Sequence, residues 1–183
     1  MQSGEQTRIP GNPLDVVDSV TGSRFVLLET AVRTGHATSD ALAREMGTSD
    51  PWMLVEALGL RLDLRGRCPD NPRLRSEVLE DPPTIVIYGE ALGDLSRLLA
   101  LRAPRLTRAP LDTITVAIEI YHYLERARPE FIKGGNQAWP RVAREVAAHA
   151  FAQELLELPF FPAEIDAVDR LARSPAYVGV KRG

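Results

Sequence analysis

The sequence predicts an α+β domain that is mostly helical and has a small sheet of two to four short strands. Apolar residues recur with the 3.6-residue period of an amphipathic helix in several stretches, most clearly over residues 110–128 and 139–157. Two short segments interrupt this helical pattern: residues 60–65, in which apolar and polar side chains alternate, and residues 84–88, which are apolar and largely β-branched. Hydrophobic residues make up 44% of the 183 positions and charged residues 26%, which is typical of one globular domain with a sizeable core.

Composition also limits the classes of function. The net charge of −3 creates no strong field toward nucleic acid or an anionic membrane. Cys68 is the single cysteine, so no internal disulfide can form. The polar start lacks the apolar region of a signal peptide, and no apolar run approaches the ~20 residues that span a bilayer. We therefore expect a cytoplasmic protein with a flexible arm at residues 1–13 and a single domain at residues 14–183.

The first part of this domain is predicted to be helical. Residues 14–34 are rich in Leu, Val and Phe and predict one or two helices. The clearer of the two covers residues 23–34, and Gly35 is expected to end it.

Two shorter helices are expected next, one from Thr38 to a stop at Gly47 and one from Pro51 to a stop at Gly59. This pair also fits a helix-turn-helix that binds DNA. Its second helix, residues 51–58, offers no Arg, Lys, Asn or Gln to a base edge, so two packed core helices are the favoured interpretation.

The strands follow. Residues 60–65 alternate between apolar and polar side chains, which predicts a half-buried strand. Residues 66–83 contain four prolines and predict a long loop, with a short middle strand at 77–79. Residues 84–88 predict a second apolar strand, ended by Gly89.

The rest of the chain returns to helices. Helical periods cover residues 90–102, 110–128 and 139–157, and a last helix begins at Pro162. Residues 174–183 are expected to form a tail, in which 176–180 could add a short strand.

Two polar residues on the helix at 110–128 indicate a site. Glu119 and His122 are three residues apart and therefore lie on one helix face. They match the last part of the His-Glu-x-x-His motif of zincin metallopeptidases, in which two histidines bind Zn²⁺ and the glutamate is the general base. Ile118 occupies the position of the first histidine and has no lone pair to offer a metal.

The helix at 139–157 carries a second motif. It begins at Glu145, continues through Ala148, His149, Phe151, Ala152, Leu155 and Leu156, and is followed by Pro159. Together the two motifs resemble those of the ImmA/IrrE-type metallopeptidases, a resemblance that covers roughly residues 38–160. Glu145 matches the glutamate that is the third zinc ligand in that family, whereas His149 stands where the family usually has Asn.

This resemblance implies a zincin-like fold and a zinc metallopeptidase ancestry. Because Ile118 removes one ligand, the favoured hypothesis is a degenerate member with weak or absent zinc binding that acts through a protein partner. Members of the family often act on a transcriptional repressor, so the resemblance implies a repressor-like protein or peptide as partner. The four polar residues Glu119, His122, Glu145 and His149 would then form a buried hydrogen-bonded cluster.

Three alternatives stay open. In the first, the chain is an active metallopeptidase with His122, Glu145 and His149 as zinc ligands and Glu119 as general base. In the second, it is a helix-turn-helix regulator associated with DNA. In the third, it is an α-rich domain whose histidines are structural. The sequence alone does not decide whether the chain is an enzyme or whether zinc is its cofactor.

Overall fold

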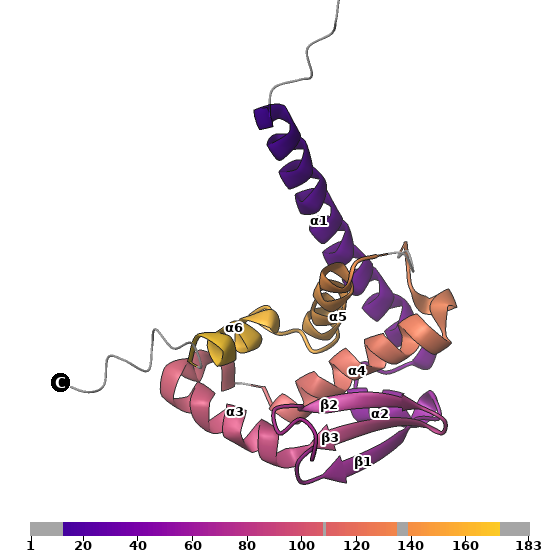
Figure 1. The fold of residues 1–183 in the computed structure, drawn as a ribbon. Coiled ribbons are helices and arrows are strands. Elements are labelled where there is room, and N and C mark those ends of the chain that lie inside the picture. Colours follow the sequence, from indigo (N-terminus) through magenta and orange to yellow (C-terminus); the bar gives the residue numbers. More distant parts are fainter. Residues whose placement is uncertain (1–12, 108, 135–138, 173–183) are drawn as a thin grey trace, which may run out of the picture.

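The computed structural model describes residues 13–107, 109–134 and 139–172, with side chains from residue 25 onward. Within these ranges the fold is mostly helical α+β, with six α-helices and a three-stranded mixed sheet (Figure 1). This confirms the predicted fold class. The arm expected at residues 1–13 lies outside the described residues except for Pro13, which begins the first helix, and the predicted tail at 174–183, with its strand at 176–180, lies outside them too.

Helix α1 (Pro13–Met46) runs without interruption through Gly35, so the predicted stop at that residue is wrong. The reason is tertiary packing against α5 (Arg141–Leu155), which lies beside α1 in Figure 1. A Cβ atom at Gly35 would lie 2.3 Å from the Ala147 carbonyl oxygen and 2.8 Å from the Ala150 Cβ atom. Gly35 therefore permits two helix backbones to approach closely, while Gly47, with φ of 70°, follows the helix end in the left-handed conformation.

Helix α2 (Pro51–Ala57) is capped by Asp50, whose side chain accepts a hydrogen bond of 2.9 Å from the Trp52 backbone N–H. Leu54 and Val55 are buried in the main core. The Trp52 indole N–H also lies 3.4 Å from the Thr113 hydroxyl of α4, so α2 packs against that helix. The packing is that of a core helix, and DNA binding by α2 stays a prediction.

The sheet has the order β1-β3-β2, with β1 (Arg61–Arg65) parallel and β2 (Ser76–Glu80) antiparallel to the central strand β3 (Pro83–Tyr88). Residues 85–88 are all buried, as expected for a central strand covered on both faces. The middle strand expected at 77–79 is present and extends one residue further in each direction.

Strand β1 is not half-buried as predicted. Leu62 and Leu64 pair with Ile85 and Ile87 and share their face of the sheet, yet 36% and 71% of their surfaces are exposed. The cause is position: β1 is an edge strand, whereas α4 packs on β2 and β3.

The helices predicted at 90–102, 110–128 and 139–157 agree with the structure to within two residues at each end, and the last helix begins one residue after the predicted start at Pro162. They are α3 (Gly89–Arg102), α4 (Leu111–Ala127), α5 and α6 (Ala163–Ala172), with short 3₁₀ turns at Pro104–Thr107 and Pro129–Phe131. The main core joins α1, α2, α4, α5 and the sheet, and a second apolar cluster joins α3, α4 and α6. In the described part of the chain, none of the helices has the length and apolar character needed to span a membrane.

Candidate functional site

A cleft of about 670 Å³ lies between β2, α4, α5 and α6. The side chains that line it include Glu119 and His122 of α4 and Glu145 and His149 of α5. Ile118 lines the same cleft and is only partly buried. The two motifs of the sequence thus face one cavity, because α4 and α5 pack against each other.

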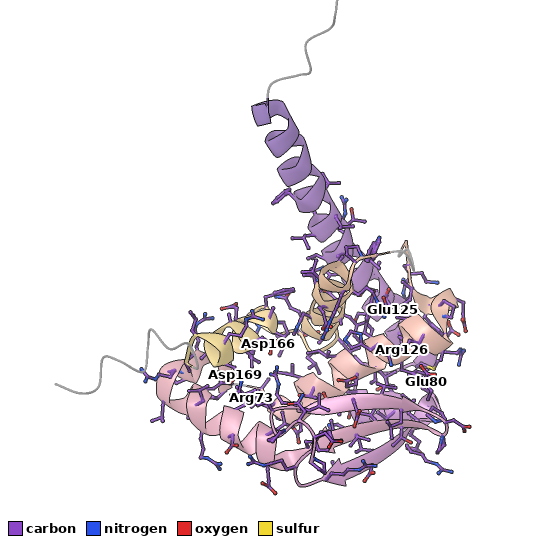
Figure 2. The ribbon with its side chains drawn as sticks, viewed as in Figure 1. Arg73, Glu80, Glu125, Arg126, Asp166 and Asp169 are labelled. Carbon is purple, nitrogen blue, oxygen red and sulfur yellow. The ribbon has the colours of Figure 1, made fainter. Side chains whose placement is uncertain are left out.

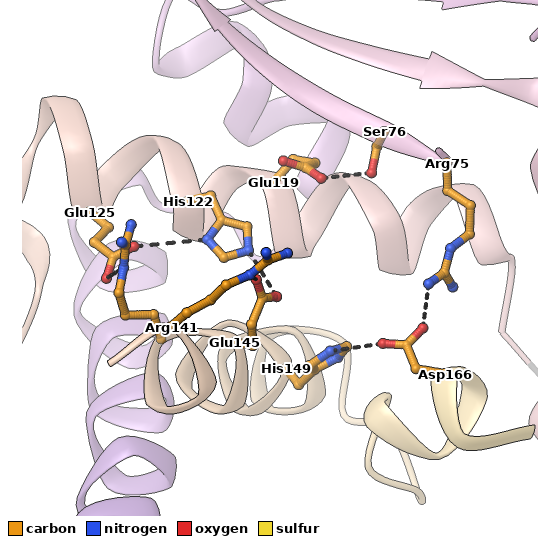
Figure 3. A network of polar contacts seen from close by, with 10 residues as sticks. Arg75, Ser76, Glu119, His122, Glu125, Arg141, Glu145, His149 and Asp166 are labelled. Carbon is orange, nitrogen blue, oxygen red and sulfur yellow. Dashed lines mark hydrogen bonds and ion pairs between the residues drawn. The ribbon is translucent and has the colours of Figure 1, made fainter. Parts of the chain in front are cut away.

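Glu119 lies at the wall that α4 shares with the sheet. Only 9% of its surface is exposed, and its carboxylate accepts a hydrogen bond of 2.6 Å from the Ser76 hydroxyl of β2 (Figure 3). Burial raises the pKa of Glu119 because the charged form is poorly solvated, and the bond from Ser76 and the charge of His122 offset only part of this effect.

His122 is the centre of the polar contacts. Its Nε2 atom lies 3.6 Å from a Glu145 carboxylate oxygen, and its Nδ1 atom lies 3.9 Å from an oxygen of Glu125 (Figure 3). Burial disfavours the charged imidazole, but the interactions with Glu125 and Glu145 and the charge of Glu119 outweigh it and raise the pKa to about 9. His122 is therefore an imidazolium at neutral pH.

Two arginines support this group of charges. The Arg144 guanidinium donates to Glu125 at 2.7 Å, and Arg141 lies 3.5 Å from Glu145. The ion-pair contact with His122 lowers the pKa of Glu145 to about 2, even though burial acts in the opposite direction. Both carboxylates that face His122 thus stay ionised at neutral pH.

His149 belongs to a separate contact. Its Nε2 atom lies 3.3 Å from an Asp166 oxygen on α6, and the other Asp166 oxygen accepts from Arg75, beside β2, at 2.5 Å (Figure 3). Burial raises the pKa of Asp166, but the contacts with His149 and Arg75 outweigh it and bring the pKa to about 2. Asp166 thereby joins α6 to both α5 and the segment that leads into β2.

The expected four-residue cluster is therefore divided in two. Glu119, His122 and Glu145 lie within electrostatic range of one another. No hydrogen bond or ion pair among the described residues joins His149 to these three. Its Nδ1 atom is buried and has no hydrogen-bond partner there.

Sequence reasoning missed several members of the site. Glu125 could have been found, because it lies one helical turn after His122 on the same face. Arg75, Ser76 and Asp166 carry no such signal, because each lies on a different element from its partners: Arg75 is 91 residues from Asp166, Ser76 is 43 residues from Glu119, and Asp166 lies on α6 whereas His149 lies on α5.

The described polar side chains of the cleft do not supply the donors that a zinc ion requires. Within the described ranges, no three His, Cys, Asp or Glu side chains are grouped so that they could hold a metal ion. Ile118 faces the cleft without a donor atom, and His149 is directed to Asp166. A zinc site needs at least three protein ligands, so the observed arrangement does not fit the metal.

Comparison of the chain with protein-family models, with curated proteins and with solved structures gave no match in any of the three searches.

Proposed function

We propose that this protein is a non-hydrolytic relative of the ImmA/IrrE-type metallopeptidases that works in the cytoplasm and binds an extended segment of a protein partner in the cleft. The observation that carries the proposal is the position of β2, an edge strand, along a cleft whose floor holds the His122–Glu145 ion pair. The family resemblance points to a repressor-like protein as partner.

The edge of β2 borders the cleft. Residues 73–78 line it consecutively. Successive side chains of a strand point to opposite faces, so a consecutive run indicates an edge and not one face of the sheet. Within the sheet β2 bonds to β3 alone, which leaves the backbone groups of its other side to pair with a partner strand. Strand addition of this kind is a common mode of peptide recognition.

The absence of hydrolysis follows from what the polar groups already contact. Both nitrogens of His122 already face carboxylates of the protein, Nδ1 at 3.9 Å from Glu125 and Nε2 at 3.6 Å from Glu145. Ile118 lies one helical turn before His122, where a second histidine would be required.

One distance favours a second candidate function, an active zinc peptidase. The 3.6 Å between His122 and Glu145 is close to the ~3.3 Å that separates two ligands of one tetrahedral zinc ion. These two side chains would be the ligands already in place, and Glu119 would be the nearby base.

Zinc titration by calorimetry of the natural chain, Ile118→His and the control Ile118→Gln separates the two functions. We expect tight binding by Ile118→His alone, because only this variant supplies a third ligand on the correct face. Tight binding by the natural chain, or zinc-dependent cleavage of a bound peptide, would refute the non-hydrolytic proposal. Negligible binding by all three would show that α4 and α5 do not have the geometry of a metallopeptidase site.

A further inference from the structure

The cleft contains a local excess of arginine. The chain as a whole has a net charge of −3. Five guanidinium groups nevertheless line this one cavity, namely those of Arg73, Arg75, Arg126, Arg141 and Arg144. Clustered charge of one sign in a cleft attracts ligands of the opposite sign.

The acidic side chains of the cleft already have partners. All four make a hydrogen bond or an ion pair within the protein. Their partners are Tyr88 for Glu77, Ser76 for Glu119, His122 for Glu145 and Arg75 for Asp166. Their charges or acceptor atoms are therefore engaged before a ligand arrives.

The arginines are only partly engaged. Arg75 and Arg144 each bind a carboxylate. The Arg141 side chain is 90% exposed and approaches Glu145 only to 3.5 Å. Arg73 and Arg126 are exposed, and neither guanidinium has a hydrogen-bond or ion-pair partner in the part of the chain that the structure describes. The free charge of the cleft is thus positive.

The two free arginines mark the two ends of β2. Arg73 precedes the strand. Arg126 adjoins its far end, since it also lines a smaller hollow with Val78 and Glu80. Figure 2 shows them at opposite ends of the cleft region, Arg73 near α3 and α6 and Arg126 near the end of α4. A five-residue strand spans ~17 Å, so one short extended segment can reach from one arginine to the other.

We infer that the cleft selects a partner segment with acidic side chains, which pairs with the edge of β2 and places carboxylates beside Arg73 and Arg126. This inference rests on the proposed peptide-binding function and adds the chemical class of the peptide. Backbone pairing gives affinity without sequence preference, and the free arginines give the preference for acidic side chains.

The test uses three fluorescent decapeptides in which Thr alternates with Glu, Gln or Lys, and fluorescence anisotropy with the full chain. We expect the Glu peptide to bind at least about fivefold more tightly than the Gln peptide, from two exposed ion pairs, and the Lys peptide to bind most weakly. The preference should shrink in high salt, because exposed charges are screened.

Arg73→Gln and Arg126→Gln should each weaken binding of the Glu peptide about two- to fivefold and leave the Gln peptide unchanged. Arg97→Gln is the matched control, because it removes the same charge from α3, outside the cleft, where Arg97 pairs with Asp94. Equal loss in Arg97→Gln, or equal binding of the Glu and Gln peptides, would overturn the acidic preference and leave peptide binding standing. If none of the three peptides binds, the proposed function itself is refuted.

Discussion

The ion pairs of His122 make the stability of the fold depend on pH above neutrality. The pKa of His122 is about 9 in the folded protein, whereas a histidine in an unfolded chain titrates at 6.5. Because the folded pKa is the higher one, the resulting stability is fully present below about pH 6.5 and is lost as the pH rises through 9. A difference of about 2.5 pH units corresponds to about 3 kcal/mol of the free energy of unfolding.

Urea denaturation at pH 6 and at pH 9.5, with EDTA present so that no metal occupies the side chains, measures this loss. We expect the free energy of unfolding of the natural chain to fall by about 3 kcal/mol between the two conditions. In His122→Gln the dependence should disappear, and in Glu145→Gln it should be smaller, because Glu125 still faces the imidazole. His36→Gln is the matched control, since His36 pairs with Glu154 at the surface and lies outside the cleft.

NMR titration of the imidazole signals gives an independent measurement. The His122 signal should titrate near pH 9 and move toward lower pH in Glu145→Gln. The reasoning would be refuted if the natural chain were equally stable at both pH values, or if His122→Gln kept the full loss. Either result would show that the imidazole is not held in its charged form.

Two further predictions concern packing around the cleft. Gly35→Ala should destabilise the fold by about 1–3 kcal/mol, because the new Cβ atom would lie 2.3 Å from the Ala147 oxygen. Gly93→Ala is the control and should stabilise the fold by about 0.5–1 kcal/mol, because its Cβ atom would meet nothing closer than 3.8 Å. Thermal melts that show equal effects of the two changes would contradict the close contact between α1 and α5. Asp166→Asn should lower the free energy of unfolding by about 2 kcal/mol at pH 7. The low pKa of Asp166 in the folded protein gives stability that is present above about pH 4 and is lost as the pH falls through 2. A change below about 0.5 kcal/mol in urea denaturation would mean that Asp166 does not hold α6 against the cleft.

The sequence by itself determined which segments form helices and strands. The periods of 110–128 and 139–157 predicted α4 and α5 to within two residues at each end, because side-chain periodicity is a local property of the backbone. The same periodicity placed Glu119 and His122 on one face of a helix, and the paired motifs indicated that Glu145 and His149 would face them across one site.

Only the tertiary structure decided what each side chain contacts. Gly35 is typical of a helix end in the sequence, yet it lies within α1 because α5 crosses there. The alternation of β1 indicates a buried face, yet Leu62 and Leu64 are exposed because the strand is at the sheet edge. Each outcome depends on a neighbour that is distant in the chain.

In the site, too, the sequence predicted which residues matter and the tertiary structure decided which of them are in contact. The paired motifs predict that His149 of α5 converges with His122 of α4, but Asp166 of α6 is the partner of His149 in the folded chain. The arginines of the cleft come from the segment before β2, from α4 and from α5, and nothing in their spacing along the chain places them in one cavity. A hydrogen bond or an ion pair requires atoms within about 4 Å, a separation that only the packing of these elements sets.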